Sequence, residues 1–288
     1  MKEHQASLLA DNFVFLEAPR WRNGRLWVSD VFDLKLYTVE AMGGRTFVCD
    51  IAGRPAGIGF LADDTPVVVS CADKKLMKVC GNEVSIYADL SAVATGDLND
   101  LVVDDDGRIY VGNFGYDLFG GAPRALTDLH IVEPDGSIRV AASELEFPNG
   151  AVIKDDGRTL VVAETWRGHL TAYDRDPQGN LSNRRLYADL GERQPDGICA
   201  DADGAIWAGC YNTGEFVRVL DGGIITDRVQ FDGHAVSCVL GGKDDTTLYC
   251  CVYLGTDEEL RARVPRSAIF TVEVSSPGPG SRASRASM

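Results

Sequence analysis

The sequence predicts an all-β fold, a six-bladed β-propeller with a metal site in its central channel. A phrase made of an acidic or amide turn and a short apolar run occurs six times in the 288 residues. The copies lie roughly 40 to 50 residues apart, which is the length of one propeller blade. No segment has the periodicity of a long helix.

Each copy of the phrase predicts a hairpin turn and the strand that follows it. Asp-Gly and Asn-Gly supply the positive φ angles of a tight hairpin, and the β-branched and aromatic residues after them favour a pleated strand. The copies occupy residues 22–28, 63–69, 105–111, 155–161, 202–208 and 244–250.

Further short strands are expected between the copies, at residues 36–39, 130–132 and 170–173. Four short strands per repeat are typical of a blade. An all-β sandwich or barrel is the alternative, but it does not require six evenly spaced copies. We therefore predict one propeller domain over residues 1–274, followed by a flexible C-terminal tail over residues 275–288, which is rich in Ser, Pro and Gly.

The net charge and the cysteine pattern indicate which binding partners and which cellular location to expect. The net charge is −15 and the sequence pI is about 4.6, so the basic footprint for nucleic acid or an anionic membrane is missing, and neither partner is expected. The N-terminal residues lack the pattern of a signal peptide. The eight cysteines form no C-x-x-C pair, which favours reduced thiols and a cytoplasmic location. Cys250 and Cys251 are adjacent, so they are expected on opposite faces of one strand.

Polar residues occur at one register in several repeats, about eight residues before each turn. Equivalent positions of different blades lie on one ring around the axis, so these side chains should converge in the channel. The register holds Glu17, Gly57, Asn99, Asn149 and Asp196, and in the sixth repeat it falls near Ser237 and Cys238.

Two carboxylates and two amides in one cavity need a counter-charge, because burying uncompensated charge is costly. Oxygen ligands suit Ca²⁺, Mg²⁺ or Mn²⁺, and Zn²⁺ is less favoured. Pro-Asn-Gly and Pro-Asp-Gly are also ordinary turn tripeptides, and Glu17 alone could be a surface acid. The shared register nevertheless favours one divalent metal ion.

Several signatures resemble those of the SMP-30/gluconolactonase/luciferin-regenerating-enzyme family, and the resemblance extends over residues 10–273. They are Phe15-Leu16-Glu17-Ala18-Pro19-Arg20-Trp21, Phe147-Pro148-Asn149-Gly150, Gln194-Pro195-Asp196-Gly197 and Gly241-Gly242-Lys243-Asp244. The resemblance implies a six-bladed propeller with one catalytic divalent metal, held by Glu17, Asn149 and Asp196. It also implies that Asn99 contacts the metal site or the substrate.

The resemblance implies hydrolysis of a small lactone, a cyclic ester, as the activity. Members that act on sugar lactones often carry an Arg two residues before the third-blade Asn, where this chain has Asp97. Because Asp cannot supply the donors of a guanidinium, a sugar lactone is not the expected substrate. Asp97 and Asn99 are nevertheless expected to contact the substrate.

In the expected mechanism the metal acts as a Lewis acid on the lactone carbonyl and activates water. Asp196 is the candidate general base, and activation of water by the ion alone is the alternative. Tyr116 belongs to an aromatic, glycine-rich loop at residues 114–121 and is a candidate substrate contact. That loop could cover the channel mouth or pack on the neighbouring blade.

Three other functions remain open from the sequence. A metal-dependent esterase or phosphotriesterase would use the same site. A condensing enzyme of the strictosidine-synthase type is disfavoured, because those relatives generally lack the metal residues. A non-catalytic propeller that binds a protein partner needs no converging oxygen ligands, and fold alone does not decide function.

Overall fold

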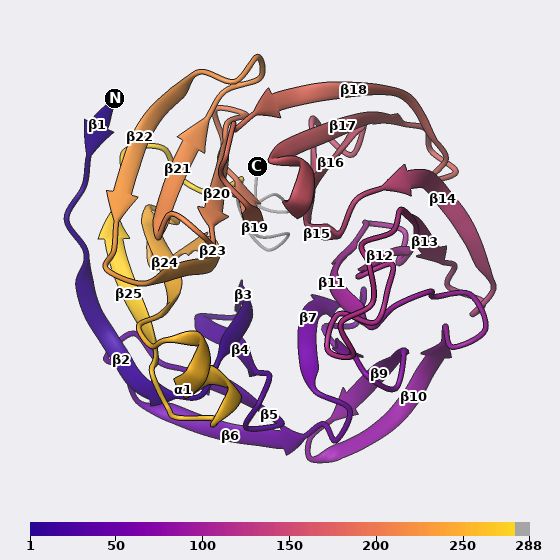
Figure 1. Ribbon diagram of the computed structural model, residues 1–288, viewed down its shortest axis with the longest axis horizontal. Coiled ribbons are helices and arrows are strands. Elements are labelled where there is room, and N and C mark those ends of the chain that lie inside the picture. The colour runs from indigo at the N-terminus through magenta and orange to yellow at the C-terminus, as the bar shows by residue number, and fades with distance from the viewer. Residues whose placement is uncertain (280–288) are drawn as a thin grey trace.

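Six β-sheets surround a central axis in the computed structural model, which describes residues 1–279 (Figure 1). The propeller prediction is therefore confirmed. The predicted turn phrases connect the innermost strand of each blade to the second strand.

The first three blades are four-stranded antiparallel sheets whose strands follow one another in chain order from the axis outward. Blade 1 contains β3 (Leu16–Arg22), β4 (Arg25–Asp30), β5 (Lys35–Val39) and β6 (Arg45–Asp50). Blade 2 contains β7 (Pro55–Phe60), β8 (Pro66–Ser70), β9 (Lys75–Cys80) and β10 (Glu83–Asp89). Blade 3 contains β11 (Leu98–Val103), β12 (Ile109–Asn113), β13 (Thr127–Val132) and β14 (Ile138–Leu145).

The last three blades include the two N-terminal strands. Blade 4 contains β15 (Pro148–Lys154), β16 (Thr159–Glu164), β17 (His169–Arg175) and β18 (Leu181–Asp189). Blade 5 contains β19 (Pro195–Ala200), β20 (Ile206–Cys210), β21 (Glu215–Val219), β22 (Ile225–Gln230) and, parallel to β22, β1 (Lys2–Glu3). Blade 6 contains β23 (His234–Gly241), β24 (Thr247–Tyr253), β25 (Ser267–Glu273) and β2 (Ser7–Phe13).

The N-terminal strand β2 closes the ring, because it pairs with β25 as the outermost strand of the last blade. Two short helices lie in loops, η1 (Thr165–Arg167) and α1 (Asp257–Arg261). Thr256 and Glu259 form a capping box at the start of α1. Within residues 1–279, no helix has the length and apolar character that crossing a bilayer requires.

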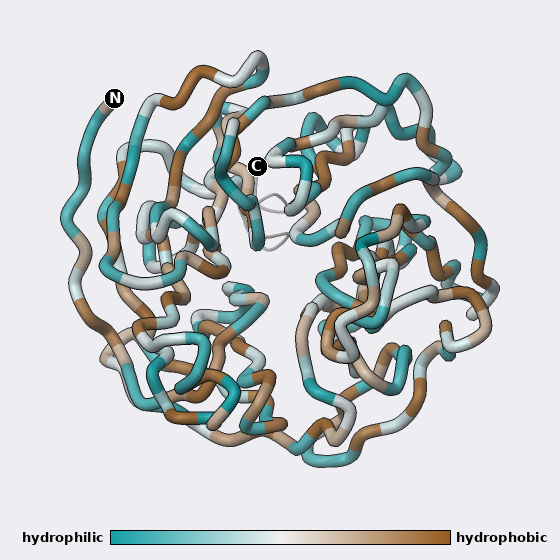
Figure 2. The backbone as a smooth tube through the Cα atoms, viewed as in Figure 1, coloured by the Kyte–Doolittle hydropathy of each residue, from teal (hydrophilic) through white to brown (hydrophobic). Residues whose placement is uncertain are grey.

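The core of the described chain is divided among the interfaces between neighbouring blades. Successive residues of a strand point to opposite faces of its sheet, so a blade with neighbours on both sides needs apolar residues at consecutive positions. Cys250 packs between blades 5 and 6, whereas Cys251 packs between blades 6 and 1, as predicted. Polar segments alternate with apolar ones along every blade (Figure 2).

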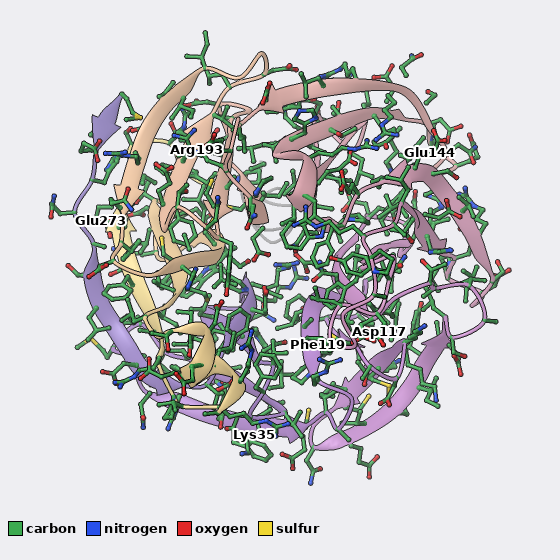
Figure 3. The ribbon with its side chains drawn as sticks, viewed as in Figure 1. Lys35, Asp117, Phe119, Glu144, Arg193 and Glu273 are labelled. Carbon is green, nitrogen blue, oxygen red and sulfur yellow. The ribbon has the colours of Figure 1, made fainter. Side chains whose placement is uncertain are left out.

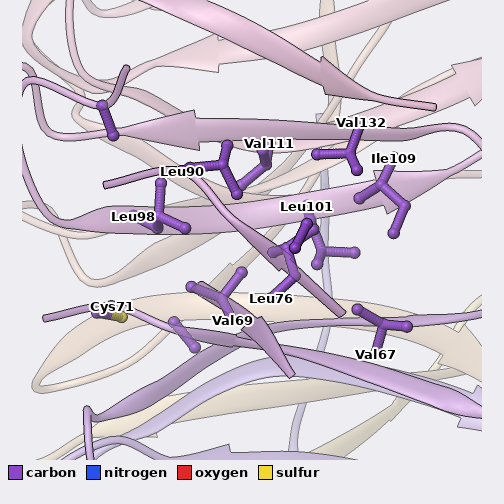
Figure 4. Packing of buried hydrophobic residues seen from close by; sticks show 13 residues of the cluster. Val67, Val69, Cys71, Leu76, Leu90, Leu98, Leu101, Ile109, Val111 and Val132 are labelled. Carbon is purple, nitrogen blue, oxygen red and sulfur yellow. The ribbon is translucent and has the colours of Figure 1, made fainter. Parts of the chain in front are cut away.

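The interface between blades 2 and 3 illustrates this packing (Figure 4). Val67 and Val69 of β8 face Leu101 of β11, whereas Val68 between them packs toward blade 1. All three valines are fully buried. Burial of one such side chain contributes about 1.5 to 3 kcal/mol, so each blade is stabilised mainly by its two neighbours.

The first residues of the predicted tail pack against the propeller. The backbone N–H of Ala202 donates to the Pro277 carbonyl, and the N–H of Gly278 donates to the Asp245 carbonyl. Residues 275–279 therefore contact the turns of blades 5 and 6. The rest of the predicted tail, residues 280–288, lies outside the described residues.

Candidate metal and catalytic site

The polar residues singled out by their register occupy one position in four blades. Glu17, Asn99, Asn149 and Asp196 are each the second residue of the innermost strand of their blade. Asn99, Asn149 and Asp196 are buried, and Glu17 is partly exposed. Electrostatic interaction links Glu17 with Asp196, and the Asn149 amide interacts with the Asp196 carboxylate. The structure therefore brings these residues together at one end of the axis.

A register shift occurs at this position in every innermost strand. In blade 1 the pairing with the second strand shifts between Glu17 and Arg20, and in blade 5 it shifts between Pro195 and Ile198. The same irregularity occurs in the other four blades. Such bulges redirect side chains away from the regular pleat, so they explain why residues at the strand entries are available to the channel.

Glycine next to the site residues allows neighbouring innermost strands to approach closely. A Cβ on Gly150 would lie 2.6 Å from the backbone nitrogen of Ile198 and 2.8 Å from the backbone carbonyl oxygen of Asp196. A Cβ on Gly57 would lie 2.6 Å from the Leu101 nitrogen. Both glycines therefore have a packing role, which sets the distance between blades at the site.

The carboxylates of the site are destabilised as anions. The pKa of Asp196 is raised to about 8, chiefly by burial, which the Asn149 hydrogen bond opposes and the Asp100 carboxylate reinforces. Burial also raises the pKa of Glu17 well above its ordinary value, and Asp196 and Asp100 add to the effect. The Ala18 N–H and Arg20 oppose this rise. A carboxyl pair of this kind favours either protons or a bound cation.

Asp100 is a site residue that the sequence did not predict. Its Oδ1 accepts a hydrogen bond from the Arg20 guanidinium at 2.7 Å and from the Leu101 N–H at 2.8 Å. Adjacent residues of a regular strand face opposite sides, and only the bulge places Asp100 near the same centre as Asn99. Arg20 pairs with Asp100 and interacts with Glu17, so full ionisation of Glu17, Asp100 and Asp196 leaves two uncompensated negative charges among these four residues.

The residues present fit one divalent cation. The Asp196 Oδ1 is buried and has no hydrogen-bond partner among residues 1–279, which is costly unless another group compensates. Carboxylate and amide oxygens are the donors that hard divalent ions prefer. Residues 1–279 contain no cluster of three or more His, Cys, Asp and Glu side chains that could hold a metal ion. The candidate set contains only two such side chains, Glu17 and Asp196, and Asn149 is its third member.

The two asparagines also connect neighbouring blades. The Asn99 amide donates to the Pro148 carbonyl at 3.3 Å, from blade 3 to blade 4. The Asn149 amide donates to the Thr165 hydroxyl at 3.3 Å, and that hydroxyl donates to the Pro195 carbonyl at 2.8 Å. The Asn99 amide is therefore oriented directly by the next blade, whereas the Asn149 amide is oriented by Thr165 of its own blade, which is itself bound to blade 5.

A polar residue at the end of the second strand holds the chain that enters the innermost strand. Asp30, the last residue of β4, accepts hydrogen bonds from the Val14 and Phe15 N–H groups, both at 2.9 Å. Glu164, the last residue of β16, accepts from the Glu146 N–H at 2.8 Å. Asn113 at the end of β12 accepts from the Gly96 N–H at 3.3 Å. A polar residue ending an apolar strand in each of these repeats was the available sequence signal.

The loop that contains Tyr116 contacts other blades as well as its own. Phe114 stacks on Phe147 of blade 4, with ring centroids 4.6 Å apart. Tyr116 accepts a hydrogen bond from the Trp166 indole at 2.9 Å. Phe119 contacts Phe32 of blade 1, with ring centroids 6.4 Å apart, and lies on the side of blade 3 that faces the ring centre (Figure 3). The loop therefore packs on neighbouring blades at the end of the axis that holds the site.

Asp97 is not a free carboxylate. It forms an ion pair with Arg54 of the neighbouring blade, and the Arg54 guanidinium lies 4.2 Å from the centroid of the Phe119 ring. The sequence predicted Asp97 as a substrate contact but did not single out Arg54, although the two residues lie 43 positions apart and each immediately precedes the innermost strand of its blade.

Tyr211 is a further residue at this end of the axis. Burial raises the pKa of its hydroxyl, and the Asp196 carboxylate is the next cause. Glu17 also contributes. Its ring stacks on His234 of blade 6, with centroids 4.4 Å apart.

The opposite end of the axis contains a separate cavity of about 380 Å³. It is lined by the last residues of the innermost strands, together with Gly278 and Pro279. One representative from each blade is Trp21, Phe60, Val103, Ile153, Ala200 and Leu240. The cavity does not include Glu17, Asn149 or Asp196, so it is distinct from the candidate metal site.

Comparison with known proteins identifies the family. A family model, the SMP-30/Gluconolactonase/LRE-like region, matches residues 15–252. Regucalcin from Danio rerio is 27% identical over 235 residues, which cover 80% of this chain and 77% of that protein.

Two solved structures have the same fold. Regucalcin from Agrobacterium tumefaciens, described as a calcium-binding protein, aligns with a TM-score of 0.81 at 18% identity and covers 96% of each chain. A gluconolactonase from Xanthomonas campestris aligns with a TM-score of 0.78 at 21% identity, over 94% of this chain and 90% of that one.

Proposed function

Because the chain belongs to the SMP-30/Gluconolactonase/LRE-like family, we propose that it is a divalent-metal-dependent hydrolase that opens a small lactone ring. One observation carries the proposal. The site holds three carboxylates and one guanidinium, and the Asp196 Oδ1 is buried without a hydrogen-bond partner in the described part of the chain. A protein that bound only a partner at its surface would not need this costly arrangement.

The ligands of the ion would be Glu17, Asn149 and Asp196, with Asn99 beside them. Bound there, a divalent cation supplies Lewis-acid stabilisation of negative charge on the lactone carbonyl oxygen. The family relationship and the oxygen donors support Ca²⁺, Mg²⁺ or Mn²⁺, with Zn²⁺ less favoured.

The chain's own residues would handle the proton. Asp196 would accept a proton from the attacking water, because its carboxylate would lie beside the ion and the reacting atoms. The water oxygen would bond to the carbonyl carbon as the ring C–O bond breaks. The ring oxygen would receive the proton, which gives one open-chain hydroxy acid. Asn99 would orient the water or the substrate through the amide that Pro148 already fixes.

The test is to remove the metal with a chelator and then to add single metal ions back. Protein treated with a chelator is expected to lose hydrolysis of aliphatic and aromatic lactones, and one of Ca²⁺, Mg²⁺, Mn²⁺ or Zn²⁺ is expected to restore it. Glu17→Gln and Asp196→Asn should each reduce kcat/KM at least about 100-fold, the scale on which single catalytic groups act. Titration calorimetry should show weaker metal binding in both variants.

Glu83→Gln is the matched control, because Glu83 is exposed on the outermost strand of blade 2. It should leave the rate and the metal affinity unchanged. An open-chain ester and a phosphotriester belong in the same assay, since the same site could act on either. Full lactonase activity in metal-free protein would disprove the proposal. Metal binding without hydrolysis of any lactone would assign the site to another reaction.

A further inference from the structure

A second ring of residues precedes the candidate metal ligands. The residue immediately before each innermost strand lies two positions ahead of that strand's second residue, the position of Glu17, Asn99, Asn149 and Asp196. In blades 2 and 6 the second residues are Ala56 and Ala235, not Gly57 and Ser237. We call the residues immediately before the innermost strands the entrance ring, and they are Phe15, Arg54, Asp97, Phe147, Gln194 and Gly233. Because the six positions are equivalent in the blades, their chemistry describes what a substrate meets before it reaches the carboxylates.

The two charged members of the entrance ring neutralise each other. Arg54 and Asp97 occupy equivalent positions in blades 2 and 3 and form an ion pair. Both side chains are largely buried, so the pair is a fixed feature and not a mobile surface contact. The Arg54 guanidinium also lies 4.2 Å from the Phe119 ring centroid, a cation–π contact. The pair therefore positions an aromatic ring and does not offer a free charge.

Aromatic rings continue from this point around the same end of the axis. Phe119 contacts Phe32 and Phe114, with ring centroids 6.4 and 6.2 Å apart. Phe147 stacks on Phe114 and lies 5.0 Å from Trp166. Between blades 1, 5 and 6 lies an apolar cluster of Phe15, Val31, Val236 and Tyr253, with Phe32 and Tyr211 packed against it.

Phe119 is the exposed member of these rings. Its side chain is 58% exposed, although a large apolar side chain is normally buried. It is held by Arg54 on blade 2 and contacts blade 1, so its position is not that of a freely moving loop residue. An exposed but fixed aromatic ring beside a catalytic centre is available to cover a ligand.

Three polar groups around the rings already have partners. The Trp166 indole donates to the Tyr116 hydroxyl, and the Tyr253 hydroxyl donates to the Thr256 carbonyl. The Asn212 amide donates to the Glu192 carbonyl. A substrate with several hydroxyl groups requires a donor or acceptor for each of them when it is desolvated. These three paired groups are poorly suited to provide them.

We propose that the site selects lactones that carry an aromatic ring, with that ring packed against Phe119, the exposed ring of the group. This inference rests on the proposed lactonase function. Arg54 is a positioning residue that acts by holding Phe119, and Asp97 holds Arg54. Polyhydroxylated sugar lactones bind more weakly at the same centre.

Three six-membered lactones test the proposal with metal-restored protein: dihydrocoumarin, δ-valerolactone and glucono-δ-lactone. An aryl ester is intrinsically more reactive, so the comparison uses KM and compares variants on one substrate. Wild-type KM should be lowest for dihydrocoumarin. Phe119→Ala should raise that KM about tenfold, as expected when an apolar contact is lost from a binding pocket. It should leave kcat for dihydrocoumarin, and both kcat and KM for δ-valerolactone, within about twofold of the wild-type values.

Phe47→Ala is the matched control, because Phe47 is 49% exposed but lies on the outermost strand of blade 1. It should change none of these constants. Arg54→Ala should raise KM for dihydrocoumarin as Phe119→Ala does. If Arg54 acts through Phe119, the double variant should be no worse than Phe119→Ala alone. Additive losses would disprove the positioning role.

A binding measurement separates this inference from the proposed function. Dihydro-2-quinolinone is the lactam counterpart of dihydrocoumarin and can be titrated calorimetrically without turnover. If no lactone is hydrolysed but the lactam binds and Phe119→Ala weakens it, the proposed function fails and the aromatic selectivity stands. Lactone hydrolysis with the lowest KM for glucono-δ-lactone, or with no effect of Phe119→Ala, would overturn the selectivity alone.

Discussion

Glu17 and Asp196 oppose the folding of the protein when no cation accompanies them. Both carboxyl groups have raised pKa values, chiefly because folding removes them from water. A carboxyl with a higher pKa in the folded state than in the unfolded state binds its proton more tightly when folded. Its contribution to stability therefore falls as the pH rises from the unfolded value through the folded value.

This property predicts the pH dependence of the metal-free protein. For Asp196 the window runs from the ordinary pKa of 3.8 to about 8. The free energy of unfolding with chelator present should be lower at pH 8 than at pH 5 by about 1 kcal/mol or more. Denaturant titration at the two pH values measures it, and the stabilisation by added divalent metal should be larger at pH 8.

The control for this prediction removes the charge. In Asp196→Asn the metal-free protein should be more stable at pH 8 than the wild type, and the difference between pH 5 and pH 8 should shrink. A pH dependence unchanged in Asp196→Asn would show that other groups cause it, such as the general repulsion within a chain of net charge −15.

At the residue scale the sequence predicted those side chains that share a register. The repeated turn phrase marks the same point in every blade, so counting back from it identified Glu17, Asn99, Asn149 and Asp196. Asp100 was not, because alternation places it on the opposite face from Asn99 and only a bulge overrides that rule. Arg54 was not predicted either, because its pairing with Asp97 arises from the approach of two blades.

At the scale of elements, the entry of each innermost strand combines a bulge with close packing against the next blade. Gly150 is the clearest case, because a side chain there would meet the backbone of blade 5 at 2.6 to 2.8 Å. Backbone atoms cannot move aside as the end of a flexible side chain can. The spacing between the blades that carry Asn149 and Asp196 therefore depends on this glycine.

Gly150→Ala should consequently destabilise the protein by about 2 kcal/mol, within the range for overpacked sites. Metal affinity should fall as well, because the two ligand-bearing strands move apart. Thermal unfolding and calorimetric titration measure the two effects. Gly44→Ala is the control, because its Cβ would have the Glu40 carboxylate 3.7 Å away as its nearest neighbour. Equal stability of the two variants would contradict a packing role for Gly150.

The elements were predictable where local chemistry determines them. The hairpin turns and the strands after them follow from Asp-Gly and Asn-Gly pairs next to β-branched residues. The long connection between β12 and β13 was not predictable in detail, because aromatic contacts with blades 1, 2 and 4 position it. Helix α1 has only five residues and no buried side chain, so it leaves no apolar periodicity in the sequence.

For the whole molecule, stability depends on the closure of the ring. Strand β2 pairs with β25, and Phe13 at its end is buried against blade 1. Without β2, the edge of β25 and the interface between blades 6 and 1 would both be exposed. Blade number and order were predictable from the repeat, but the joining of the first strand to the last blade was not, since residues 1–13 contain no copy of the phrase.

Removal of residues 1–13 should therefore lower Tm by roughly 5 °C or more, in line with the loss of several kcal/mol, and should promote aggregation through the open edge. Removal of Met1, Lys2 and Glu3 alone should change Tm by less than about 2 °C, because these residues are exposed. Differential scanning calorimetry with light scattering measures both. Similar Tm values for the two truncations would show that β2 does not close the ring energetically.

The pairing of β2 with β25 also fixes an order of events during synthesis. Ser7 pairs with Thr271, so the partner strand is made about 260 residues later than β2. At about 5 to 20 residues per second, β2 waits roughly 10 to 50 s on the ribosome with its edge unpaired. The first five blades can stack in that interval, but the circle joins only after the final strand emerges. The ring of a newly made chain therefore stays open until that last strand is available.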